Sequence, residues 1–282
     1  TYIKAYDEIR QLYADQPKAV QNYYGEITAM DRSIGMLRDE LRRLSIEDNT
    51  LFWYTSDNGP QGPLNRNPPG SSGGLRDRKG TLWEGGIRVP AIIEWPARIS
   101  QRRVTSVAAN TIDIYPTLLD IVGVDVARQP KPLDGISILP LIDGRITERS
   151  QPMGFWANFS AGQGVRSSEL LAALEQDQAS GTTTATLMND APTRQARVAD
   201  QLKVFAGQGL VGDAAWIDNR YKLRRIGNRQ TDEASYELYD LEADTTESHN
   251  LVNDMPDRVA SMKRQLEEWQ QSVVRSLEGD DY

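Results

Sequence analysis

The sequence contains no cysteine and a single histidine, His249. The first absence excludes disulfides, zinc-thiolate sites and a cysteine nucleophile, and the second leaves almost no room for a histidine triad or a multi-histidine metal site. A metal ion would have to be held by oxygen ligands, which favours Ca²⁺ or Mg²⁺.

Long hydrophobic runs are also absent. No stretch approaches the roughly 18 to 20 apolar residues that a membrane-spanning helix needs, and the first residues show no signal-peptide pattern, so we expect a soluble chain without a membrane span. The 282 residues carry 32 basic and 40 acidic side chains, a net charge of −8. Without a basic stripe, this balance argues against nucleic acid as a partner.

The amino-terminal half alternates helical and strand patterns. Apolar residues at three-and-four spacing predict a long helix from Val20 to Leu44, and the β-branched and aromatic run 50–55 predicts a buried strand. A long polar loop then leads to a second strand at 89–96 and a helix at 110–123. This order favours an α/β layered domain.

Composition changes divide the chain into three predicted parts. Residues 1–147 form the α/β core, 148–212 an extended insertion rich in Gly, Thr and Ser, and 213–282 a carboxyl-terminal subdomain. In that subdomain, short strands at 214–218, 220–226 and 236–241 predict a small antiparallel sheet, and Pro256 opens a last amphipathic helix.

Asp57 and Asn58 follow the predicted strand 50–55 directly. Open α/β sheets bind ligands at the carboxyl ends of their strands, and a carboxylate beside an amide oxygen suits Ca²⁺ or Mg²⁺. A tight turn is the alternative, because Asp-Asn-Gly tolerates left-handed backbone. The motif alone does not decide between these two interpretations.

Lys79 lies in a basic, glycine-rich segment ahead of the second strand. Glycines let the backbone approach an anion, and a flexible ammonium can stabilise the charge that develops during ester cleavage. A solvated basic surface is the alternative. Glu84 and Arg88 could support such a site as a pair, or could form a salt bridge that only orients the loop.

Two segments together resemble the arylsulfatase-type sulfatases of the alkaline-phosphatase superfamily. They read DNTLFWYTSDNGP at 48–60 and GLRDRKGTLWEGGIRVP at 74–90, and both order and spacing match. The helix 23–44 and the distal segments 220–223 and 236–241 also look like this family. The resemblance implies a partial alkaline-phosphatase-like layered core with a small antiparallel sheet and helix at the carboxyl end.

By this resemblance, Asp57 and Asn58 would complete a Ca²⁺ site, with Mg²⁺ less expected, and Lys79 would contact the sulfate. The family mechanism is attack on sulfur by a hydrated formylglycine made from Cys or Ser in the motif [Cys/Ser]-x-Pro-x-Arg. Here Pro-x-Arg occurs at 96–98, 192–194 and 256–258, preceded two places earlier by Glu94, Asp190 and Asp254, none of which can form the aldehyde. The sequence therefore contains no nucleophile.

The paired aspartates and the histidines of the family's amino-terminal half are absent too. The simplest hypothesis is a carboxyl-terminal portion of a sulfatase, inactive alone, whose partners are a sulfated small molecule or glycan and its own missing amino-terminal half. The alternatives are a non-catalytic module that binds sulfated glycans or a partner chain, and a phosphoric ester hydrolase of the same superfamily, against which the segment KGTLWEGG at 79–86 argues. The family suggests a periplasmic or secreted location.

Overall fold

The computed structural model describes residues 7–61, 70–124, 133–157, 209–228, 231 and 233–278. Its contacts divide the chain into two compact units. Unit 1 comprises Thr1–Val126, Gly135–Gln151 and Asp240–His249, and unit 2 comprises Ala127–Asp134, Pro152–Tyr239 and Asn250–Tyr282. Most of the predicted insertion, residues 158–208, lies outside the described residues, so the three predicted domain boundaries stay a prediction.

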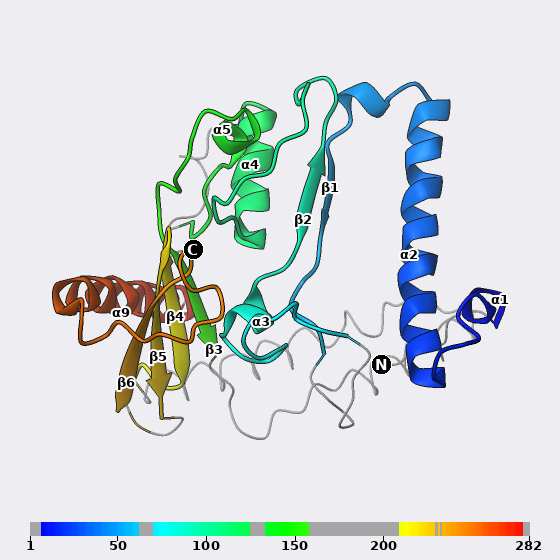
Figure 1. Ribbon diagram of the computed structural model, residues 1–282. Helices are drawn as coiled ribbons and strands as arrows, with labels where there is room; N and C mark the ends of the chain where they lie inside the picture. The colour runs from blue at the N-terminus through cyan, green and yellow to red at the C-terminus, as the bar shows by residue number, and fades with distance from the viewer. Residues whose placement is uncertain are drawn as a thin grey trace, which may run out of the picture. The chain divides into compact units, whose positions relative to one another are not determined.

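Unit 1 contains a two-stranded sheet that follows the two strands expected from the sequence. β1 (Phe52–Thr55) pairs antiparallel with β2 (Ala91–Glu94) (Figure 1). In this pairing, Phe52 lies opposite Glu94. Apolar side chains from both strands pack on a buried cluster formed by α5 (Leu139–Ile142) and its flanks. The cluster consists of Ile138, Leu141 and Ile142, with Trp53, Ile93, Ile99, Val107, Ile136 and Ile146 packed against it.

The long predicted helix is present as α2 (Lys18–Arg43), preceded by α1 (Asp7–Gln11) and followed by the 3₁₀ turn η1 (Glu47–Asn49). Arg38 of α2 forms an ion pair with Glu94 of β2 at 2.8 Å. Gly25 is the one buried residue of α2, and much of its apolar face is exposed. No helix in the described ranges is both long and apolar enough to cross a membrane.

A buried ion pair holds the last helices of unit 1 together. Asn110 caps the 3₁₀ turn η2 (Thr111–Asp113), which continues into α4 (Ile114–Ile121). Asp113, fully buried, accepts two hydrogen bonds from the guanidinium of Arg149, at 2.6 and 2.8 Å. The same carboxylate accepts the backbone N–H groups of Asn110 and Ile136, at 2.8 and 2.9 Å. One side chain thus joins three separate segments.

Unit 2 is a four-stranded sheet covered by one long helix (Figure 1). The strand order is β3 (Met153–Ala157), β4 (Asp213–Asp218), β5 (Tyr221–Gly227) and β6 (Ala234–Asp240), and the helix is α9 (Pro256–Glu278). β4 pairs antiparallel with both β3 and β5. β3 lies in the stretch interpreted as an insertion and was not expected as a strand.

Leu223 and Leu238 of this sheet pack against Met262 and Leu266 of α9, and all four are buried. The periodicity that predicted the last helix marks the same face, because Met262 and Leu266 are four residues apart. Gly154 of β3 allows the helix to approach, since a Cβ there would lie 2.4 Å from the ring of Trp269.

Candidate functional site

The residues Ser56–Pro60 form a tight turn at the end of β1, and the two predicted metal ligands meet in it. The amide nitrogen of Asn58 donates to Asp57 Oδ1 at 2.6 Å, and the backbone N–H of Asn58 donates to the same oxygen at 2.9 Å. Asp57 is exposed and Asn58 partly buried. The bend brings the two polar heads together without left-handed backbone at Asp57, Asn58 or Gly59, and the role of the pair as metal ligands stays a prediction.

The Lys79 loop, residues 76–86, runs alongside this turn. The backbone N–H of Lys79 donates to the carbonyl of Pro60 at 3.0 Å, and the N–H of Gly59 donates to the carbonyl of Gly86 at 2.9 Å. Two backbone hydrogen bonds, one at Lys79 and one at Gly86, therefore join the loop to the turn. Lys79 itself is exposed.

Glycine permits this close approach. A Cβ on Gly59 would lie 1.9 Å from the carbonyl oxygen of Gly85, and one on Gly85 would lie 2.1 Å from the carbonyl oxygen of Asp77. These contacts are with backbone atoms, which cannot move aside as the tip of a side chain can. Gly59 therefore permits the loop to pack on the turn, and Gly85 permits the loop to pack on itself.

Substituting Gly59→Ala is expected to destabilise the protein by about 1–3 kcal/mol or more, because the added methyl group overpacks a backbone contact. A matched control is Gly35→Ala in α2, where a Cβ would meet nothing within 4 Å. That substitution is expected to stabilise by about 0.5–1 kcal/mol, as alanine favours the helix. Denaturant unfolding of both variants measures the difference, and equal midpoints would contradict the tight packing of the turn.

Glu84 and Arg88, the predicted supporting pair, lie in and after the short helix α3 (Glu84–Ile87). Their nearest charged atoms are 3.9 Å apart, with the side chain of Glu84 5% exposed and that of Arg88 52% exposed. The two side chains form a loose ion pair at the carboxyl end of the Lys79 loop. This geometry fits the salt-bridge interpretation, and a contribution to the site stays a prediction.

Sequence reasoning missed a third acidic residue, Glu247, which lies at this loop. Its Oε2 accepts the backbone N–H of Glu84 at 2.7 Å, and its backbone carbonyl accepts Nη1 of Arg76 at 2.8 Å. The guanidinium of Arg76 also lies over the ring of Trp83, 3.4 Å from its centroid. No local signal in the sequence could have linked positions so far apart.

Calcium binds six to eight oxygens, and Asp57 and Asn58 would provide two of them. Their donor chemistry fits a hard cation, and exchanging the oxygen and nitrogen of the Asn58 amide by rotation would turn its oxygen toward the shared space. Among the described residues, no three acidic, histidine or cysteine side chains gather in a group that could hold a metal ion. The remaining ligands of such a site would have to come from other residues.

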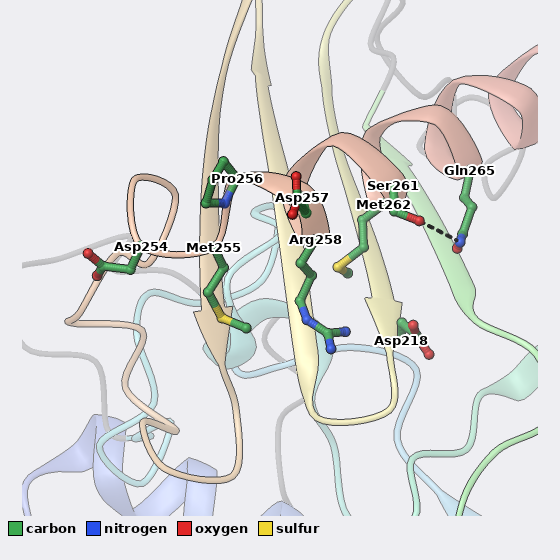
Figure 2. Close-up of a pocket in the computed structure, with 9 residues that line it drawn as sticks. All are labelled: Asp218, Asp254, Met255, Pro256, Asp257, Arg258, Ser261, Met262 and Gln265. Atoms are coloured by element: carbon green, nitrogen blue, oxygen red, sulfur yellow. Dashed lines mark hydrogen bonds between the residues drawn. The ribbon is translucent and has the colours of Figure 1, made fainter.

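A cavity of about 520 Å³ lies elsewhere, at the start of α9 in unit 2 (Figure 2). It is lined by Asp218, Asp254, Met255, Pro256, Asp257, Arg258, Ser261, Met262 and Gln265. The guanidinium of Arg258 already lies over the ring of Tyr221, 4.0 Å from its centroid. None of the residues predicted from the sequence to form a site lines this cavity.

The sulfatase family model matches residues 1–124. Steryl-sulfatase of Mus musculus is 32% identical over 132 residues, which are 45% of this chain and 21% of the mouse protein. N-acetylgalactosamine-6-sulfatase of Canis lupus familiaris is 34% identical over 143 residues, 49% of this chain and 27% of the dog protein. The matches thus span about a quarter of the length of these relatives.

Solved structures share the fold over nearly the whole chain. Ps i-CgsB superimposes with a TM-score of 0.67 at 21% identity, covering 99% of this chain and 52% of that chain. The putative sulfatase YidJ of Bacteroides fragilis gives a TM-score of 0.61 at 17% identity, over 95% of this chain and 50% of that chain. A phosphonate monoester hydrolase of Agrobacterium radiobacter matches more distantly, with a TM-score of 0.52 at 19% identity, over 90% of this chain and 41% of that chain.

These comparisons confirm the predicted fold class, a partial alkaline-phosphatase-like core with a small carboxyl-terminal sheet and helix. Both predicted motif segments, 48–60 and 74–90, lie inside the matched region. Residues 1–124 match the sulfatase family, as the resemblance of these segments predicted.

Proposed function

We propose that this chain contributes to a sulfate ester hydrolase, and that Asp57, Asn58 and Lys79 lie at the sulfate-binding end of its active site. The observation that carries the proposal is the pairing of the Asp57–Asn58 turn with the Lys79 loop through two backbone hydrogen bonds. The backbone segments that carry a carboxylate, an amide and an ammonium are thereby joined within unit 1. The match of residues 1–124 to the sulfatase family supports the assignment.

In this proposal, Lys79 stabilises negative charge on the oxygens of the sulfate group. An exposed lysine can follow an anion because its ammonium is mobile on a long stem. Asp57 and Asn58 offer oxygen ligands for Ca²⁺, whose charge, when the ion is bound, would neutralise sulfate oxygens. The close approach at Gly59 keeps the backbones of the turn and the loop together.

The nucleophile of the proposed reaction lies outside these 282 residues. By the family resemblance it is a formylglycine in a [Cys/Ser]-x-Pro-x-Arg motif, which the sequence does not contain. The chain alone is therefore proposed to be inactive. Its proposed partner is a polypeptide that supplies the rest of the sulfatase core.

The exposed apolar surface of unit 1 supports this partner. Several large apolar side chains on α2, β2 and α4 are more than a third exposed, and a complete layered core would bury such side chains. They include Ile27 (44%), Met36 (74%), Leu37 (49%), Ile92 (61%) and Tyr115 (48%). Ps i-CgsB, whose structure covers 99% of this chain, has about twice the length of this chain.

The proposed substrate is a sulfated small molecule or glycan. One structure of the same fold is described as a complex with its substrate D-glucosamine-2-N,6-O-disulfate, and it matches 89% of this chain with a TM-score of 0.55. Hydrolysis of a phosphoric ester is the second candidate, because the phosphonate monoester hydrolase shares the fold. The family match over the Lys79 segment favours sulfate.

The test is turnover of an aryl sulfate and an aryl phosphate, each with Ca²⁺, by the chain alone and together with a separately supplied amino-terminal sulfatase core. We expect turnover of the aryl sulfate only when the chain and the amino-terminal core are both present. Turnover by the isolated chain would contradict the proposed missing nucleophile, and preferential cleavage of the phosphate would favour the second candidate. Binding of a sulfated glycan without turnover in any combination would favour a non-catalytic module.

A further inference from the structure

The segment Asp240–His249 belongs to unit 1 although the residues on both sides of it belong to unit 2. Within this segment, Glu247 is fully buried. Its carboxylate accepts the N–H of Glu84 at 2.7 Å, and its carbonyl accepts Nη1 of Arg76 at 2.8 Å. One residue therefore bonds to both ends of the segment that carries Lys79.

Those two contacts are made where the Lys79 loop closes. The N–H of Gly85 donates to the carbonyl of Arg76 at 2.8 Å, so Arg76 and Gly85 form the base of the loop. Arg76 is further fixed by stacking on Trp83. The other side of the loop is held at Lys79 by Pro60. Because Glu247 fixes the base of the loop, the backbone of Lys79 is held in one position next to the turn that carries Asp57 and Asn58.

The backbone of Glu247 is held in an uncommon conformation. Its φ angle is +54°, in the left-handed region that few residues with side chains adopt. Asp244 supports it, since the carboxylate accepts the N–H groups of Ser248 and His249 at 2.7 and 2.8 Å. Burial of the Asp244 carboxylate acts to raise its pKa. The hydrogen bonds that it accepts from His249, Thr246 and Ser248 have the larger effect, so the pKa is lowered. A strained residue kept by such support commonly serves a site.

We propose that Glu247 is a positioning residue, whose buried carboxylate fixes the base of the Lys79 loop and thereby the place of the Lys79 ammonium. The role of the ammonium itself rests on the proposed function, whereas the hold on the loop does not. A buried carboxylate that accepts a backbone N–H forms a charge-assisted bond, stronger than a neutral one. Removing it leaves the N–H of Glu84 without that acceptor in a buried place.

Hydrogen exchange of the purified protein tests the hold on the loop. Relative to the wild type, Glu247→Ala is expected to accelerate exchange of the amides in 84–86 by about tenfold or more, because a buried bond to a charged group is lost. Glu247→Gln keeps an acceptor oxygen and is expected to restore much of the protection. The matched control is Glu268→Gln at an exposed position of α9, which should leave these amides unchanged.

Unaltered exchange in Glu247→Ala would overturn the proposal, and so would an equal acceleration throughout α4 and α5, since the effect would then be general unfolding of unit 1. If the alanine variant does not fold, Glu247→Met, which fills the buried space but has no carboxylate to accept the N–H of Glu84, takes its place and is judged by the same two criteria. These readouts need no activity, so they stand if the proposed hydrolase function fails.

A double-mutant cycle tests whether Glu247 acts through Lys79. It is measured in the active combination of parts, that is, this chain together with a separately supplied amino-terminal sulfatase core. Glu247→Ala is expected to lower kcat about tenfold with Lys79 present, because misplacing a charge-stabilising group weakens its contact in the transition state. In a Lys79→Ala background the same substitution should change kcat less than about twofold, since residues that act as a unit are not additive. Equal losses in both backgrounds would assign Glu247 a purely structural role.

Discussion

Replacing Lys79 by alanine is expected to lower kcat for an aryl sulfate by about 10² to 10³ in the active combination of parts, as removal of one oxyanion-stabilising group generally does. The geometric basis is the hydrogen bond from the N–H of Lys79 to Pro60, which places its backbone beside the Asp57–Asn58 turn. The effect should fall on kcat more than on KM, because charge on the sulfate oxygens grows in the transition state. Steady-state kinetics of the purified variant measure both.

Two further variants sharpen this result. Lys18→Ala removes an exposed lysine at the start of α2 and should leave kcat unchanged. Lys79→Arg keeps the charge but replaces a compact ammonium by a planar guanidinium, so we expect only partial recovery. An unchanged rate in Lys79→Ala would remove Lys79 from the site, and an equal loss in Lys18→Ala would point to general loss of positive charge.

The sequence was sufficient for those features that depend on neighbours in the chain. The strand at 52–55 and the turn after it follow from a β-branched and aromatic run that ends in Ser-Asp-Asn-Gly. The two long helices follow from apolar periodicity. Asp57 and Asn58 are adjacent, so their meeting required no knowledge of the fold, and the family resemblance added Lys79.

The features that were missed depend on contacts between distant segments. Glu247 contacts a residue 163 positions earlier in the sequence, and no period or motif encodes such a pair. The helices α3 and α5 have four residues each, too short to show periodicity. The strand β3 was missed because the range 148–212 that contains it is mostly rich in Gly, Thr and Ser. Its pairing partner β4 lies more than 50 residues away.

The same dependence on distant contacts makes Asp113 the most consequential structural carboxylate that we describe in unit 1. Its side chain is 0% exposed and that of Arg149 1% exposed, and the two form a bidentate pair. Taking such charges out of water is costly, and the cost is offset only while the partner and the remaining hydrogen bonds are present. Asp113 also accepts the N–H groups of Asn110 and Ile136.

Asp113→Ala is therefore expected to destabilise the protein by about 3–5 kcal/mol, the usual effect of leaving one charge of a buried pair alone. Denaturant unfolding measures the change. The matched control is Asp39→Ala, which breaks the exposed pair with Arg42, where the side chains are 76% and 51% exposed; we expect a change within about 0.5 kcal/mol. Similar losses in both variants would contradict the distinction between the two pairs.

A further variant separates the charge from the hydrogen bonds. Replacing a buried ion pair by apolar residues of similar volume is often neutral, because both charges leave together. The combination Asp113→Leu with Arg149→Met should nevertheless remain destabilised, since the N–H groups of Asn110 and Ile136 would lose their acceptor at a partly buried place. Full recovery in the double variant would mean that the ion pair alone, and not the joining of three segments, explains the effect of Asp113.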